Sequence, residues 1–199
     1  MPPAARRTDP PVPSAAAFGF FGKLPARGDF VRRGLPRGFA EPWDGWLSGL
    51  IGASKAAAGG AWLPAFLEAP VWRFALPAGH CGKQAAAGLM LPSVDRVGRY
   101  FPLTFAAVGD GAPAEAWLDR CEAAGRAALE QDLDPDAVMA MLGVPDLQKA
   151  GAPNGFAEWW TEGGPRVGPS RMAMAGLPDA AAFARMLGLD GERMDERQV

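Results

Sequence analysis

The sequence predicts an α+β domain in which a central, mainly antiparallel sheet is flanked by helices. Stretches rich in strand-forming residues cluster in the middle of the chain, at 71–76, 86–91 and 101–108, and are expected to form an antiparallel meander. Segments with helical periodicity lie on either side of them, over 37–56 and 114–133. Strands and helices that are grouped in this way favour an α+β fold, whereas a doubly wound parallel sheet would alternate them.

The helix over 37–56 is predicted because its apolar residues recur at spacings of three, four and seven, which places them on one face. These residues are Phe39, Trp43, Trp46, Leu47 and Leu50. Glycines at 59–60 are expected to end the helix, and 62–67 adds a short helical turn.

The remaining elements are shorter. Asp134 followed by Pro135 is a common helix start, so a short helix is expected there that ends at Gly143. The others are a first strand at 18–21, a short strand or extended arm at 30–31, late strands at 156–160 and 171–175, and a last helix at 178–187.

Length and composition indicate one folded domain. The 199 residues are 49% hydrophobic and include seven Trp and eleven Phe, which is enough apolar mass for a single core. Residues 1–17 are rich in Pro and Ala and are expected to form a disordered leader. The domain is expected over 18–190, followed by a polar tail at 191–199.

Charge and cysteine content narrow the class of protein. A net charge of −2 argues against a binder of nucleic acid, although residues 1–40 hold seven Arg or Lys and only two Asp. Two cysteines do not make a disulfide framework and fit a reducing compartment. The sequence has no apolar stretch of about 18 residues that would predict a membrane span. A cytoplasmic location is therefore expected.

No set of catalytic or metal-binding residues stands out in the sequence. His80 is the only histidine, so there is no His pair for a metal ion. Cys81 follows it directly, but neighbouring residues of an extended loop point apart, and a Cys–His dyad needs hydrogen-bond reach. We therefore expect no enzymatic activity, no catalytic residue, no metal and no cofactor.

Lys23 belongs to a segment that is similar to a fragment of a phosphate-binding loop. Gly19, Gly22 and Lys23 follow the start of the first predicted strand. A Walker motif needs four residues between its glycines and a Ser or Thr after its lysine, whereas the spacing here is shorter and Leu24 takes the hydroxyl position. Binding of phosphate or a nucleotide by Lys23 and the arginines is kept as an alternative function.

Two segments, 22–33 and 92–102, interleave Arg and Asp with Gly, Pro and aromatic residues. The guanidinium of Arg is a planar fork that pairs with carboxylates. The candidate partner-binding residues are Lys23, Arg27, Asp29, Arg32, Asp95, Arg96 and Arg99. Two interpretations are open: the charges pair with one another and lock the loops, or they form an exposed surface that docks an acidic or phosphorylated protein segment.

The same segments resemble the TagF family of accessory proteins of bacterial type VI secretion. The likeness is carried by FGKLPARGDFVR at 21–32 and by GLMLPSVDRVGRYFPLT at 88–104. Shorter motifs are LP at 35–36, WDxWL at 43–47 and WRFxL at 72–76. Motif positions that we regard as structural are Trp43, Trp46, Trp72, Pro92 and Ser93.

The resemblance implies a cytoplasmic protein that represses type VI secretion post-translationally and has no known enzymatic activity. It also implies a protein partner, the forkhead-associated scaffold protein of the secretion system. The family has no agreed catalytic residues to carry over. A structural subunit of the secretion apparatus is a further alternative.

Overall fold

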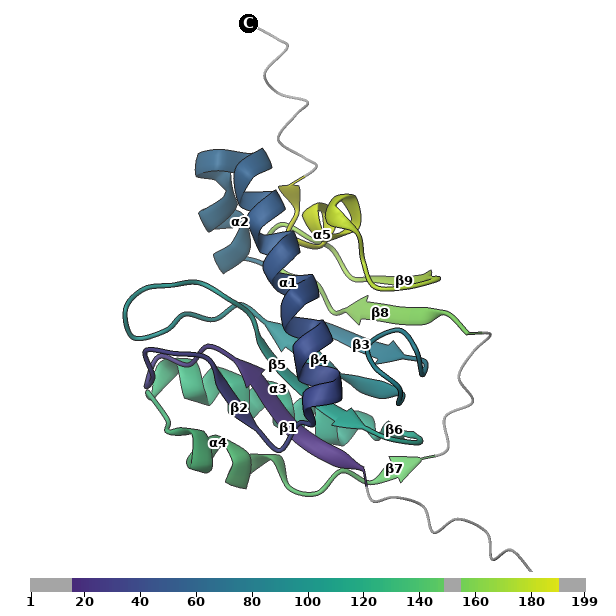
Figure 1. The fold of residues 1–199 in the computed structure, drawn as a ribbon. Coiled ribbons are helices and arrows are strands. Elements are labelled where there is room, and N and C mark those ends of the chain that lie inside the picture. Colours follow the sequence, from purple (N-terminus) through teal and green to yellow (C-terminus); the bar gives the residue numbers. More distant parts are fainter. Residues whose placement is uncertain (1–15, 149–154, 190–199) are drawn as a thin grey trace, which may run out of the picture.

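The structure is a computed structural model that describes residues 16–148 and 155–189. The predicted tail at 191–199, and all but the last two residues of the predicted leader at 1–17, lie outside the described residues. Within the described ranges the chain forms an α+β fold with a large antiparallel sheet between helices, as the sequence predicts (Figure 1).

The main sheet has seven strands in the order β2-β1-β5-β4-β3-β8-β9, and all neighbouring pairs are antiparallel. Its strands are β1 (Ala17–Gly22), β2 (Val31–Arg33), β3 (Trp72–Leu76), β4 (Ala86–Leu91), β5 (Leu103–Val108), β8 (Ala157–Thr161) and β9 (Ser170–Met174). The meander predicted in the middle of the chain is β3-β4-β5. A separate two-stranded sheet, which the sequence did not predict, consists of β6 (Ala112–Pro113) and β7 (Leu147–Gln148).

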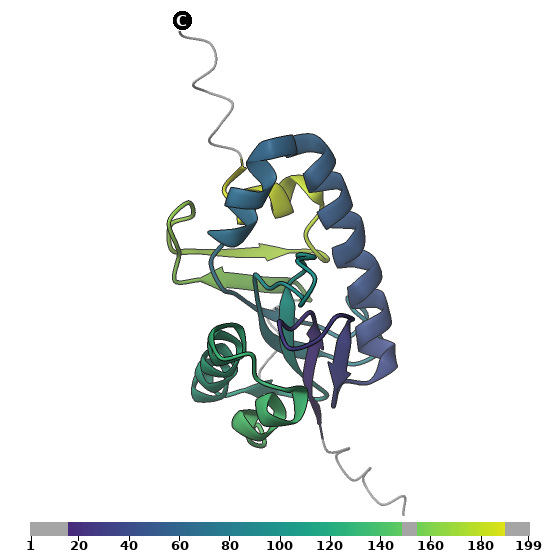
Figure 2. The same ribbon diagram turned by 90° about the vertical axis from the view of Figure 1, so that its left-hand side faces the viewer.

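Helices cover both faces of the main sheet (Figure 2). One face carries α1 (Arg37–Ala58), the 3-10 turn η1 (Gly59–Ala61), α2 (Trp62–Leu67) and α5 (Ala180–Met186). The other face carries α3 (Glu115–Glu130) and α4 (Pro135–Leu142). Because both faces are covered, every residue of β4 and β5 is buried.

Two tryptophans, one buried and one partly buried, attach α1 to the sheet and to the C-terminal segment. Trp43 is fully buried, stacks on Trp159 of β8, and donates a hydrogen bond from Nε1 to Oγ1 of Thr104 (2.9 Å). Trp46 donates from Nε1 to the carbonyl oxygen of Pro178 (2.8 Å). Each indole therefore combines apolar burial with a satisfied N–H group.

Most element boundaries differ from the sequence prediction by one to three residues, and two of the differences have a clear physical reason. β5 begins at Leu103 rather than at 101, because Pro102 has no N–H group to donate to the strand ladder. α3 ends at Glu130 rather than at 133. Asp132 adopts a φ of 50°, a left-handed conformation that a continuing α-helix does not contain.

Candidate functional site

The two charged segments leave the sheet at the same edge because of the strand register. Phe21, near the end of β1, lies opposite Thr104, and Leu103 lies opposite the last residue of β4. The ends of β1 and β4 and the start of β5 therefore meet. The loop at 23–30, here called the first loop, and the loop at 92–102, the second loop, project side by side (Figures 1 and 2).

Asp95 is the centre of the contacts between the two loops. Its buried carboxylate accepts hydrogen bonds from Nζ of Lys23, from Nε of Arg99 (2.7 Å), and from the backbone N–H groups of Val97 (3.0 Å) and Arg99 (2.9 Å). Burial by itself raises the pKa of a carboxyl group. The bonds from Lys23 and Arg99 outweigh that effect and hold the pKa of Asp95 well below its usual value, so the group is ionised at neutral pH.

Two further hydrogen bonds fix the two loops relative to each other. Oγ of Ser93 donates to the carbonyl oxygen of Lys23 (2.7 Å), and the backbone N–H of Arg96 donates to the carbonyl oxygen of Arg27 (2.9 Å). The second of these bonds joins the backbones of two candidate residues directly. Arg27 and Arg96 are therefore neighbours in space, although they lie in different motifs.

Arg99 closes the second loop onto the first. Its guanidinium donates to the carbonyl oxygen of Gly28, and Nη2 lies 3.6 Å from Oδ1 of Asp29, whose side chain is 99% exposed. The turn that returns the chain to Arg99 contains Gly98, with a φ of 82° that favours glycine, and its N–H donates to the carbonyl oxygen of Asp95 (3.0 Å).

The structure contains both the internal lock and an exposed surface, and Arg99 belongs to both. Lys23 and Asp95 are 5% and 3% exposed and pair with each other. Arg27, Arg32 and Arg96 are exposed. In the part of the chain that the structure describes, none of these three guanidinium groups pairs with a carboxylate. Arg27 and Arg32 donate only to nearby carbonyl oxygens.

Two apolar residues that sequence reasoning missed lie on the same loops. Phe30 stacks on Phe21 with ring centroids 5.6 Å apart and meets the edge of Phe101 at 4.7 Å, yet it stays 46% exposed. Nζ of Lys23 lies 4.6 Å from the centroid of the Phe30 ring. Val97, on the second loop, is 65% exposed. The available signal was a bulky apolar residue directly after a charged one in each motif, which is Phe30 after Asp29 and Val97 after Arg96.

A hollow of about 370 Å³ lies beside Phe30, where the first loop and β2 approach the start of α1. Its volume is in the range of sites that accept ligands or side chains. Its lining combines aromatic rings with charges of both signs, and the residues are Phe21, Phe30, Arg32, Arg37, Ala40, Glu41 and Asp44.

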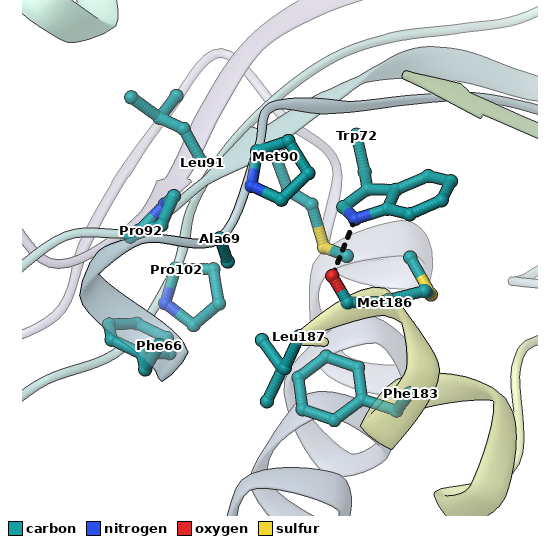
Figure 3. A pocket seen from close by; sticks show the side chains of 11 residues that line it. Phe66, Ala69, Trp72, Met90, Leu91, Pro92, Pro102, Phe183, Met186 and Leu187 are labelled. Atoms are coloured by element: carbon teal, nitrogen blue, oxygen red, sulfur yellow. Dashed lines mark hydrogen bonds between the residues drawn. The ribbon is translucent and has the colours of Figure 1, made fainter. Parts of the chain in front are cut away.

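Another hollow, enclosed by α2, α5, β3 and β4, is apolar but very small (Figure 3). Its volume is about 20 Å³, close to the space of one water molecule. Trp72 donates from Nε1 to the carbonyl oxygen of Met186 (3.0 Å) at its wall, and Pro92 of the second loop lies on another side. The hollow is a packing gap of the core and is too small for a cofactor.

The two cysteines are buried and have raised pKa values. Burial raises the pKa of the Cys81 thiol to about 12, and burial also raises the pKa of Cys121. Neither is a reactive thiolate at neutral pH.

Among the described residues, no three His, Cys, Asp or Glu side chains are grouped so that they could hold a metal ion. Over 16–148 and 155–189, no helix is long and apolar enough to cross a membrane.

The fold and the loops define a class of protein: an α+β domain in which two interlocked charged loops stand at one edge of an antiparallel sheet. Residues 19–143 match the family described as TagF N-terminal domain, Type VI secretion system-associated. The match includes both loops and more than half of the chain, so the protein belongs to the TagF N-terminal domain family and is associated with type VI secretion.

A solved structure of a similar protein supports this assignment. The chain is 36% identical to PA0076 from Pseudomonas aeruginosa PAO1, whose crystal structure superposes with a TM-score of 0.79. The alignment covers 88% of this chain and 96% of that one. No functionally curated protein matches the sequence.

Proposed function

We propose that this protein represses type VI secretion post-translationally, in the cytoplasm and without catalysis, by binding a protein component of the secretion system. The forkhead-associated scaffold protein is the partner that the family resemblance favours. The observation that carries the proposal is the position of Arg27 and Arg96. They are exposed and adjacent, on loops that Lys23 and Asp95 hold from inside.

Arginines held in this way suit protein recognition. Arg forms forked, charge-assisted hydrogen bonds with carboxylates and is enriched among the residues that contribute most to interfaces. A loop that is already ordered loses less conformational entropy on binding. The site also lacks features of a nucleotide loop, since Gly22 ends β1 and the ammonium group of Lys23 faces Asp95.

The proposal is tested in the native cell with the charge reversals Arg27→Glu and Arg96→Glu combined. We expect that deletion of the gene raises secretion activity, that the wild-type protein lowers it again, and that the double variant does not. Purified double variant should also fail to capture the purified scaffold protein. Arg185→Glu, an exposed change on α5, is the matched control and should behave like wild type.

A thermal melt separates loss of binding from loss of folding. The double variant should melt close to wild type, because neither guanidinium has a carboxylate partner within the described residues. If the folded double variant represses secretion and captures the scaffold like wild type, the site is wrongly assigned. If the wild-type protein is found at fixed stoichiometry in the purified apparatus and its deletion abolishes secretion, the protein is a structural subunit instead.

A further inference from the structure

The joined loops expose two large apolar side chains in addition to their charges. Phe30 and Val97 are 46% and 65% exposed, one on each loop. Arg27, Arg96 and Arg99 belong to the same loops and are exposed around them. Protein interfaces characteristically combine an apolar or aromatic centre with a polar rim, and the residues that contribute most are often aromatic residues and Arg.

Phe30 is held in place before any partner arrives. Its ring contacts those of Phe21 and Phe101. The ammonium group of Lys23, which is itself fixed by Asp95, lies 4.6 Å from the centroid of the Phe30 ring. An aromatic side chain that keeps nearly half of its surface exposed while its position is fixed adds contact area at little entropic cost. The hollow of about 370 Å³ beside the ring can receive a partner side chain.

The charges of the surface select the chemistry of the partner. The exposed side chains of the two loops and of β2 include five arginines against one carboxylate, that of Asp29. The arginines are Arg27, Arg32, Arg33, Arg96 and Arg99. A partner segment that carries negative charge is therefore complementary to the surface, and one that carries positive charge is repelled.

Acidic groups next to the surface favour carboxylates over phosphates. Asp29 lies 3.6 Å from Arg99, and Glu41 and Asp44 line the hollow beside Phe30 together with Arg32 and Arg37. These carboxylates offset the charges of the arginines next to them, which are Arg99, Arg32 and Arg37. Arg27 and Arg96, which have no carboxylate partner among the described residues, are left as two single positive charges, and two singly charged carboxylates match them one to one.

Building on the proposed function, we propose that Phe30 and Val97 anchor an acidic, unphosphorylated segment of the partner protein. An apolar side chain of the segment contacts Phe30 and enters the hollow beside it, while carboxylates of the segment pair with Arg27 and Arg96. The surface is thus a hydrophobic anchor with a cationic rim rather than a pure charge patch.

The test compares matched apolar substitutions. Phe30→Ser is paired with Phe156→Ser, because both rings are 46% exposed, and Val97→Ser is paired with Val144→Ser, which is 78% exposed. The probe is the purified scaffold protein, used before and after phosphatase treatment, and the dissociation constant is measured by calorimetry. We expect Phe30→Ser and Val97→Ser each to weaken binding by about tenfold or more. The two controls should stay within about twofold of wild type, and phosphatase treatment should change nothing.

Three outcomes overturn the inference. Equal binding by the loop variants and their controls would show that the anchor lies elsewhere, and the proposed function would still stand because the wild-type protein binds. Loss of wild-type binding after phosphatase treatment would show that the arginines bind a phosphate group of the partner rather than its carboxylates. Failure of the wild-type protein to bind the scaffold at all would overturn this inference together with the choice of partner. Val97→Ser keeps the test decisive if Phe30→Ser fails to fold, since Val97 is 65% exposed and lies outside the ring contacts that hold Phe30.

Discussion

Lys23 and Asp95 lie 72 residues apart in the sequence and form an ion pair whose side chains are 6% and 0% exposed. The pair joins the loop after β1 to the loop between β4 and β5. A buried ion pair contributes little net stability, because the desolvation of both charges offsets their attraction. Its main effect here is to fix the position of two loops, and with them that of Arg27 and Arg96.

Removing one member of this pair should destabilise the protein strongly, although the intact pair contributes little to the free energy of unfolding. Asp95→Asn leaves the ammonium group of Lys23 buried without a counter-charge, and we expect it to lower the free energy of unfolding by about 3 to 5 kcal/mol. Asp29→Asn is the control in the same loops, since its side chain is 99% exposed. Urea denaturation of both variants checks this, and equal midpoints would contradict a structural role for Asp95.

The same carboxylate predicts how stability depends on pH. The pKa of Asp95 is lowered by folding from an ordinary value of 3.8, so its contribution is fully present above that pH. As pH falls below about 3.8 the unfolded state takes up the proton first, and the stabilisation is progressively lost. The difference in unfolding free energy between wild type and Asp95→Asn should therefore shrink on going from pH 7 to pH 3. A constant difference would contradict this assignment.

Local sequence patterns predicted most of the fold. The apolar residues of α1 repeat at helical spacing, and the strand-forming residues of β3, β4 and β5 are contiguous, so each element could be recognised on its own. The pair β6 and β7 was missed because two-residue strands have no periodicity to detect. The end of α3 was missed because the left-handed φ of Asp132 is not signalled by its neighbours.

The candidate site was predicted less completely than the fold. The sequence identifies both charged motifs. The register of β1, β4 and β5 then decides which of their charged residues hold the two loops together and which stay exposed. That register places Asp95 against Lys23 and Arg99, and leaves Arg27 and Arg96 without carboxylate partners among the described residues. Phe30 and Val97 were overlooked because an apolar residue in a motif suggests core packing. Their exposure depends on how the two loops fold, which the sequence pattern does not indicate.

Arg73 of β3 should behave as a tether between the sheet and α3. Its side chain is 13% exposed and pairs with Glu115 (2.5 Å), Asp119 (2.7 Å) and Glu122 (3.3 Å). We expect Arg73→Met to destabilise the protein by about 1.5 to 3 kcal/mol, since charge-assisted hydrogen bonds are lost from a largely buried donor.

The control for this tether is Arg126→Met, which removes an exposed pair with Glu122 from the same helix and should have little effect. Arg73→Lys should fall between Arg73→Met and wild type, because an ammonium group keeps the charge but lacks the planar fork whose separate nitrogens reach Glu115 and Asp119. Thermal denaturation of the three variants measures this expected order of stability. Wild-type stability in Arg73→Met would refute the tether.

The cysteines should be inert in the native protein. Cys81 and Cys121 are 2% and 0% exposed, and burial raises the pKa of both thiols. We expect no reaction with a thiol-specific reagent such as dithionitrobenzoate at neutral pH, and reaction of two thiols per chain after denaturation in guanidinium. Rapid modification of one thiol under native conditions would show that its surroundings open readily.

Gly88 should be irreplaceable at the centre of the sheet. A Cβ atom at this position in β4 would lie 2.0 Å from the carbonyl oxygen of Phe105 in β5, and backbone atoms of a central strand cannot move aside cheaply. We expect Gly88→Ala to destabilise the protein by more than about 4 kcal/mol or to prevent soluble expression.

The control is Gly45→Ala on the exposed side of α1, where nothing lies within 4 Å of the new methyl group and the helix should gain about 0.5 to 1 kcal/mol. Urea denaturation measures both effects. If Gly88→Ala folded with wild-type stability, β4 and β5 would have to be farther apart than their register requires.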